Sequence, residues 1–222
     1  MHEHDHDHAH AAHAPIEDGG ELTYYEKLTW AIQSLLVEKS ILTADEVRKQ
    51  IEDMDARTPA LGAKVVARAW GDPAFKARLL ANAKAAVAEV GIDSGSSAVL
   101  VAVENTETVH NVVVCTLCSC YPRTLLGLPP DWYKSLNYRS RVVVDPRGVL
   151  REFGLELDPH VEVRVYDSTA DMRYLVIPRR PSGTEQMSEE ELASLVTRDS
   201  MIGVAEARTP EMQPGIKAAA PA

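Results

Sequence analysis

Residues 111–122, NVVVCTLCSCYP, join an apolar run to a cluster that holds all three cysteines of the 222-residue chain. Residues 112–114 predict a short buried strand, and the loop that follows contains Cys115, Cys118 and Cys120. Thiolates are strong ligands for soft metal ions, and three of them within six residues concentrate negative charge that a metal ion can offset. An odd number of cysteines at such short spacings does not suit disulfides. The segment therefore predicts a metal site in a loop at the end of a strand.

The cysteine spacing also bears on the kind of metal. Structural zinc usually takes four Cys or His ligands from two separated pairs, and the chain has no second cysteine pair. His110 is a candidate fourth ligand, although it stands at the upstream end of the apolar run. Three sulfurs from one tight loop leave room for backbone nitrogens, which would suit a trivalent ion with more than four ligands. A structural zinc knot and a redox cysteine cluster remain alternatives at this point.

The residues around the cysteines resemble the metal-claw segment of the nitrile hydratase α subunit. The similarity covers residues 21–205, and beyond the claw it includes residues 62–70, 126–134, 138–143, 145–147, 164–169, 173–176, 183–185 and 202–204. The cysteine motif is highly specific. The resemblance implies the metal-binding subunit of an enzyme that hydrates a nitrile to the amide.

The resemblance also implies roles for the claw residues. Cys115, Cys118 and Cys120 would bind the metal through sulfur, and Ser119 and Cys120 through their backbone nitrogens. Cys118 is expected to mature to a sulfinic acid and Cys120 to a sulfenic acid, both of which lie on the ordinary oxidation ladder of thiolates. In the family, threonine at the position of Thr116 accompanies cobalt and serine accompanies iron. The expected cofactor is therefore one Co(III) per chain.

Cys120 and Ser119 are the candidate catalytic residues. A trivalent metal with one open position can lower the pKa of bound water, polarise a nitrile, or do both. The sulfenate oxygen of Cys120 could be the nucleophile or a general base, and the sequence does not choose between these routes. The Ser119 hydroxyl could donate into the site, with a loop-stabilising role as an equal alternative.

Arg123 is the main departure from the family pattern. The family usually has Trp-Pro after the Tyr-Pro pair that ends the claw, and the tryptophan lines the substrate pocket. Here these positions are Arg123 and Thr124. A guanidinium in the pocket would favour nitriles that carry a carboxylate or a strong dipole. Alternatively, Arg123 faces the partner subunit or pairs with a carboxylate.

The expected partner is a nitrile hydratase β subunit, because the family's arginines and tyrosine that close the site are not in this chain. The assembly would be an αβ dimer or a pair of such dimers, with a small nitrile as substrate and a cobalt-insertion activator protein as a candidate further partner. Two other functions remain open. One is the γ subunit of a thiocyanate hydrolase, which shares the cobalt claw. The other is a non-catalytic cobalt-binding or delivery protein.

The N-terminus carries six of the eight histidines within residues 1–13. Such a tract cannot form a core. It could gather cobalt for the claw, but a dispensable solvated tail is the preferred interpretation.

The composition fits a cytoplasmic enzyme subunit. With 45% apolar and 25% charged residues, the chain can bury a core in one or two domains. A net charge of -10 argues against nucleic-acid binding, and neither a bilayer-spanning run nor a signal peptide is expected. Unpaired cysteines suit a reducing compartment.

The predicted fold is α+β, with a helical N-terminal arm followed by a mixed α/β layered metal-binding domain. We expect a disordered His/Asp-rich tail (1–20), the helical arm (21–92), the catalytic domain with the claw (93–205) and an extended tail (206–222). Helices are predicted from residue 21, from Thr43 with Glu46 completing a capping box, over 61–70, and from Asp72-Pro73 to Gly91. Strands are predicted over 98–103, 111–114, 161–166 and 173–177. Further helices are expected to start at Asp131, at Asp145-Pro146 and after Ser188.

Overall fold

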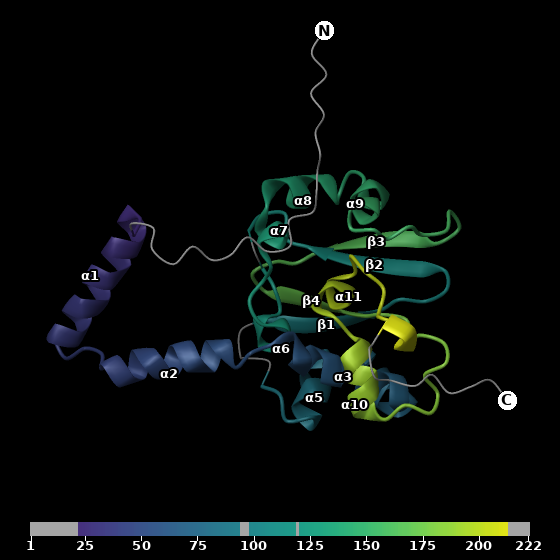
Figure 1. Ribbon diagram of the computed structural model, residues 1–222, viewed down its shortest axis with the longest axis horizontal. Helices are drawn as coiled ribbons and strands as arrows, with labels where there is room; N and C mark the ends of the chain where they lie inside the picture. The colour runs from purple at the N-terminus through teal and green to yellow at the C-terminus, as the bar shows by residue number, and fades with distance from the viewer. Residues whose placement is uncertain (1–21, 94–97, 119, 213–222) are drawn as a thin grey trace, which may run out of the picture. The chain divides into compact units, whose positions relative to one another are not determined.

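The computed structural model describes residues 22–93, 98–118 and 120–212, and these combine helices with short parallel strands (Figure 1). The prediction of an α+β fold is confirmed. The chain separates into two compact units, one ending at Gln50 and the other beginning at Ile51. The predicted N-terminal tail and the last ten residues of the predicted C-terminal tail lie outside the described residues.

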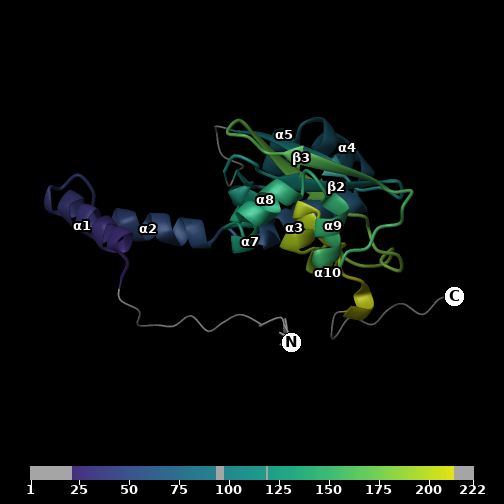
Figure 2. The same ribbon diagram turned by 90° about the horizontal axis from the view of Figure 1, so that it is seen from above.

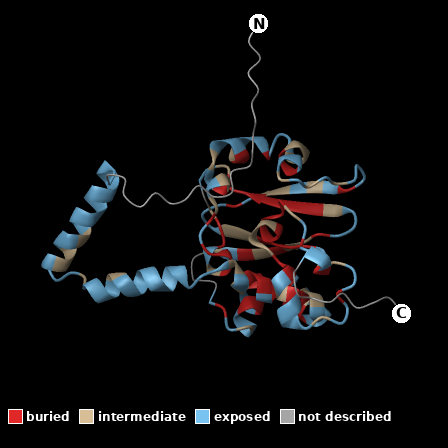
Figure 3. Cartoon of the chain, viewed as in Figure 1, coloured by how far each residue is buried: buried red, intermediate tan, exposed pale blue. Residues whose placement is uncertain are grey.

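Helix α1 (Tyr24–Glu38) is the main element of the first unit. Thr23 and Glu26 form a reciprocal capping box, in which the Glu26 side chain accepts from the Thr23 amide at 2.7 Å. No residue of α1 is buried, as the blue and tan colouring of this helix shows (Figure 3). Trp30 is 62% exposed. Helix α2 (Ala44–Asp55) is capped in the same way by the predicted pair Thr43 and Glu46, and it too has no buried residue. These two helices therefore begin where capping chemistry predicts.

Helices α3 (Pro59–Gly71), α4 (Pro73–Ala81) and α5 (Ala83–Glu89) belong to the second unit. The single helix predicted from Asp72 to Gly91 is wrong, because two helices occur there. Asn82 has φ -152° and ψ 86°, which breaks the helix, and its side chain accepts from the amide of Ala85 to start α5. The buried side chains of α3 to α5 share one core with the strands. The structure thus places these three helices in one core with the strands. The expected domain boundary at residue 92 stays a prediction.

Four strands form two parallel pairs. Strand β1 (Val99–Glu104) pairs with β4 (Met172–Ile177), and β2 (Val109–Val114) pairs with β3 (Glu162–Asp167). All four predicted strands are confirmed, with ends shifted by one or two residues. Val114 lies opposite Asp167 in the register, so the carboxyl ends of β2 and β3 meet at one edge. That edge is where parallel sheets commonly place functional loops.

Short helices fill the connections. Between β2 and β3 the chain forms α6 (Arg123–Leu126), α7 (Asp131–Lys134), α8 (Leu136–Arg141) and α9 (Pro146–Glu152). After β4 come α10 (Glu189–Leu195), α11 (Arg198–Ile202) and a 3-10 helix (Pro210–Met212). The last of these lies in a segment predicted to be extended. Helices α6, α8 and α11 were not predicted, because helices of four to six residues show too little periodicity.

The helices cover the strands on both sides. Helices α4 and α5 contact β1, α9 contacts β3, and α11 contacts β2 and β4. In Figure 2, α4 and α5 lie on one side of β2 and β3, whereas α8, α9 and α10 lie on the other. Figure 3 shows buried residues concentrated in the strands and in the helices that contact them. Within the described ranges, no helix is both long and apolar enough to cross a membrane.

Candidate metal centre

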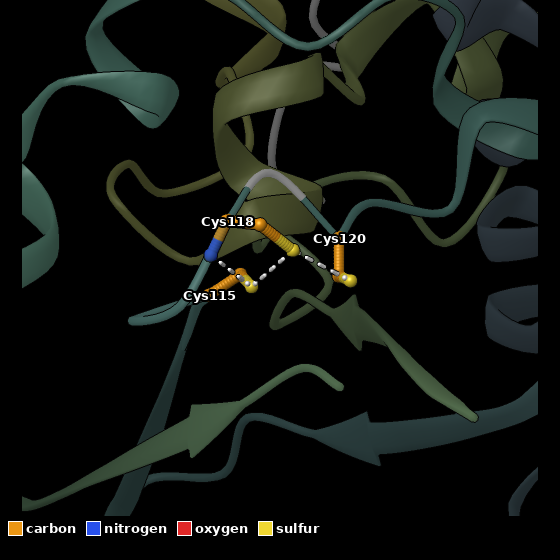
Figure 4. Close-up of side chains that lie close together, drawn as sticks. All are labelled: Cys115, Cys118 and Cys120. Atoms are coloured by element: carbon orange, nitrogen blue, oxygen red, sulfur yellow. Dashed lines mark hydrogen bonds between the residues drawn. The ribbon is translucent and has the colours of Figure 1, made fainter. Parts of the chain in front are cut away.

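The claw is the loop that leaves the end of β2. Cys115 directly follows the last strand residue and is fully buried, Cys118 is exposed, and Cys120 is half-buried. The Cys115 and Cys118 sulfurs lie 3.4 Å apart, and the Cys118 and Cys120 sulfurs lie 3.1 Å apart. All three Sγ atoms fall within 4.8 Å of one another, and Figure 4 shows their side chains converging. Apart from this trio, the described residues contain no group of three or more metal-ligating side chains this close.

The donor chemistry of this cluster fits a metal ion. Burial, the neighbouring Cys118 thiol and the charge on Cys115 raise the pKa of Cys120 to about 12. Three thiolates at these separations repel one another unless a cation compensates their charge. Metal binding to cysteine requires the deprotonated sulfur and releases the proton. With three sulfurs and no fourth Cys or His side chain beside them, the described cluster does not complete the usual four-ligand set of structural zinc.

The first turn of the claw is held by side chains from other elements. Asp167, at the end of β3, accepts from the Thr116 amide at 2.9 Å and from the Thr116 hydroxyl at 2.5 Å. Arg139 of α8 donates to the carbonyl oxygens of Cys115 and Thr116 at 3.0 and 2.7 Å. These bonds fix the turn from both sides, since Asp167 accepts from the amide and the hydroxyl of Thr116 while Arg139 donates to the two carbonyls.

Two tyrosines hold the backbone on either side of this turn. The Tyr133 hydroxyl donates to the Cys120 carbonyl at 2.9 Å, and the Tyr138 hydroxyl donates to the Val113 carbonyl at 2.7 Å. Burial raises the pKa of both phenols, so both remain protonated donors at neutral pH. The claw is therefore supported by buried hydrogen bonds from α7 and α8.

His110 is not placed to complete the site. Its Nε2 lies 2.7 Å from the Gly203 carbonyl, which can only accept, so Nε2 carries the proton. Its Nδ1 lies 3.2 Å from the side-chain amide of Asn105 and accepts from it. Both ring nitrogens are therefore used within the core, and the candidate role of His110 as a fourth ligand is wrong.

Comparison with known proteins identifies the family. The family model described as nitrile hydratase, alpha chain, matches residues 23–205. The chain belongs to the nitrile hydratase α-subunit family. It is 54% identical over 181 residues to the low-molecular weight cobalt-containing nitrile hydratase subunit alpha of Rhodococcus rhodochrous, covering 81% of this chain and 87% of that one.

Two further relatives show the breadth of the family. The thiocyanate hydrolase subunit gamma of Thiobacillus thioparus is 41% identical over 196 residues, covering 83% of this chain and 81% of that one. Among solved structures, a double mutant of the Fe-type nitrile hydratase from Comamonas testosteroni Ni1 superposes with a TM-score of 0.81 and 42% identity. That match covers 89% of this chain and 98% of the other. The nitrile hydratase α fold is thus shared by proteins named for different metals and substrates.

Within this nitrile hydratase α-subunit fold, the predicted site residues are only partly brought together. The three cysteines converge, whereas Ser119 lies outside the described residues. Arg123 is the first residue of α6, and it is exposed. Across residues 22–93, 98–118 and 120–212, its guanidinium makes no hydrogen bond or ion pair. Its alternative role of pairing with a carboxylate is therefore not seen in this part of the chain.

Arg139, Asp167 and Tyr133 are site residues to which the sequence assigned no role. All three lie in segments that carry the family resemblance, and no other feature of the sequence indicated a role for them in the site. The contacts of Arg139 and Asp167 with the claw span 23 to 51 residues along the chain. Only the fold brings them to the claw.

The buried His110 predicts a pH dependence of stability. Burial lowers its pKa, and this effect outweighs the opposing bond to Gly203 and the charge of Glu206. The unfolded chain then binds more protons than the native chain as the pH falls below about 6.5, so stability falls there. The slope for one group is at most about 1.4 kcal/mol per pH unit. We expect urea unfolding between about pH 7 and pH 5 to show a shallower loss for His110→Gln than for the wild type.

The matched control is His160→Gln, because His160 is an exposed histidine whose partner is Asp158 at the surface. This variant should not show the shallower loss that is expected of His110→Gln. Identical slopes for the two variants would contradict the role assigned to burial of His110.

Proposed function

We propose that this chain is the metal-binding α subunit of a nitrile hydratase, which adds water to a nitrile carbon to give the amide. The observation that carries the proposal is the convergence of three cysteine sulfurs at the end of β2, in a chain 54% identical to a cobalt-containing nitrile hydratase α subunit. Cys115, Cys118 and Cys120 would hold one Co(III), together with the backbone nitrogens of Ser119 and Cys120. Bound there, the ion would act as a Lewis acid that makes water more nucleophilic and the nitrile carbon more electrophilic.

The three cysteines of the proposed site differ in how far they are exposed to solvent. Cys115 is buried in the core, and its thiolate would hold the ion there. Cys118 is exposed and Cys120 half-buried, which leaves their sulfurs open to oxidation and to substrate. We propose that Cys118 becomes a sulfinic and Cys120 a sulfenic acid, and that Cys120 and Ser119 are the residues that meet the substrate.

A β-type subunit is the proposed partner. The claw is open on its Cys118 side, and Leu117 beside it is 85% exposed. An apolar side chain left exposed beside the proposed site favours a partner subunit that covers this side. The exposed apolar residues of α1, such as Trp30, offer a second surface for a partner.

The function is tested by co-expressing the full-length chain with a candidate β-type subunit in medium containing cobalt. The complex should convert a small nitrile to its amide, and either chain alone should not. Full activity of the isolated chain would refute the need for a partner. A cobalt-loaded complex that hydrates no nitrile would refute the proposed reaction.

A second candidate function, thiocyanate hydrolysis, is favoured by Arg123. Its exposed guanidinium stands three residues beyond the claw, and a fixed positive charge at the site would attract an anionic substrate. The 41% identity to a thiocyanate hydrolase γ subunit is compatible with this reading. The same complex assayed with thiocyanate distinguishes the two functions. The cobalt-delivery alternative depends on residues 1–13, which lie outside the described residues.

Arg123→Trp should change substrate preference without changing cobalt content. Removing the guanidinium and adding an apolar ring should shift the ratio of kcat/KM values toward an aromatic nitrile and away from a carboxylate-bearing one. One well-placed polar group is worth about 1–3 kcal/mol, so the ratio should move roughly ten- to hundredfold. Arg151→Trp, at an exposed position on α9, is the matched control and should leave the ratio unchanged. An unchanged ratio for Arg123→Trp would assign Arg123 to an interface or the surface.

A further inference from the structure

The peptide unit between Cys115 and Thr116 is held at both of its polar ends. Its carbonyl oxygen accepts from Arg139 Nε at 3.0 Å, and its N–H donates to Asp167 Oδ1 at 2.9 Å. A peptide unit is planar, so holding both ends fixes the orientation of the plane and restricts the backbone angles on either side. The first turn of the claw is therefore set by α8 and by the end of β3.

We propose that Arg139 is a positioning residue of the claw, which sets the first turn of the loop before a metal ion binds. The inference rests on the proposed function for the identity of that metal. Arg139 spans two successive carbonyls, those of Cys115 and Thr116, with two nitrogens of one rigid fork. A guanidinium suits this task because its donors are fixed in one plane, whereas a lysine offers a single flexible ammonium group. Tyr138, the preceding residue of α8, donates its hydroxyl to the carbonyl of Val113.

The position of the sulfurs depends on this turn. The amide of Cys118 donates to the Cys115 sulfur at 3.2 Å (Figure 4). A bond between residues three apart requires the chain to turn across the two residues between them. Without Arg139, two part-buried carbonyls lose their donors and the turn becomes one of several conformations of the loop. Binding of the metal ion would then also have to order the loop, which lowers the affinity for the metal. Outer groups that orient metal ligands typically change metal affinity by about 10- to 100-fold, and we expect an effect of that size.

Arg139→Gln tests the proposal in the full-length chain, with Arg141→Gln as the matched control. Arg141 lies two residues further along the same helix, but it forms an exposed ion pair with Glu152. Two measurements are made on the metal-free protein. Amide hydrogen exchange of the segment around residues 113–120 reports the order of the loop without any metal. Titration with Co(II) against a competing chelator, followed by the sulfur-to-cobalt charge-transfer absorption, reports affinity.

The proposal predicts that the amide hydrogens of the claw segment exchange at least about tenfold faster in Arg139→Gln than in the wild type. The variant should also bind Co(II) about 10- to 100-fold more weakly. Arg139→Lys should lie between this variant and the wild type, and it is the test if Arg139→Gln does not fold. Arg141→Gln should stay within about twofold of the wild type in both measurements.

Two results would overturn the positioning role. In the first, both Arg139 variants have the same exchange rate in the claw segment and the same affinity for Co(II) as Arg141→Gln. In the second, amide hydrogens throughout the chain of an Arg139 variant exchange faster by one common factor, which would show a general loss of stability. A wild-type chain that binds no cobalt would refute the proposed function instead, and the exchange comparison would still decide the role of Arg139.

Discussion

Replacing Cys118 with alanine is expected to abolish cobalt retention and nitrile hydration. The substitution removes one anionic ligand, and losing a ligand should cost more than the roughly 10- to 100-fold that outer groups typically contribute to metal affinity. Cys118 is the sharpest of the three positions because its side chain is exposed, so alanine leaves no cavity in the core. Cobalt is measured by elemental analysis after dialysis against a chelator, and amide formation is measured in the assembled complex.

Cys115→Ala and Cys120→Ala should have the same effect on the metal. Cys115 is buried, so its alanine variant should also lose some stability, which urea unfolding of the metal-free chain measures separately. A variant at any of the three positions that keeps full cobalt and full hydration would contradict the assignment of the claw.

Gly203→Ala is expected to be the most destabilising small substitution near the site. Gly203 has φ +92°, a left-handed conformation that costs other residues roughly 1–2 kcal/mol. A Cβ there would also collide with the Asn111 carbonyl in strand β2, whose shift would cost about 1–3 kcal/mol more. The combined loss should be roughly 3 kcal/mol, measured by urea unfolding. Because β2 leads directly into the claw, cobalt binding should weaken as well.

Gly154→Ala is the control for the conformational cost of a positive φ alone. Gly154 also has a positive φ, of +81°, but a Cβ there meets nothing within 4 Å. It should lose only the roughly 1–2 kcal/mol of the conformational cost and leave cobalt binding unchanged. Equal losses for the two variants would contradict the collision with Asn111.

Those features of the fold that depend on local sequence could be predicted. The valine-rich strand β2 and the cysteine loop follow one another in the sequence, and the capping pairs at Thr43 and Ser188 mark the starts of α2 and α10. The break at Asn82 was missed because alanine-rich sequence on both sides favours a continuous helix.

The support of the claw could not be predicted, because it depends on tertiary contacts. Arg139 and Asp167 approach Thr116 from segments 23 and 51 residues away, after several short helices and a strand. Neither residue carries a local pattern that distinguishes it from the surface arginines and aspartates of the chain. The ion pair of Arg141 with Glu152 illustrates this, since the same residue type in the same helix lies at the surface.

The most direct test of the central claim is metal analysis combined with peptide mass mapping of the claw, after co-expression with the β-type subunit. We expect one cobalt per chain to survive dialysis against a chelator. The peptide that contains the claw should carry two additional oxygen atoms at Cys118 and one at Cys120. Stoichiometric zinc with three unmodified cysteines, or cobalt that dialysis removes, would contradict a trivalent cobalt centre in this chain.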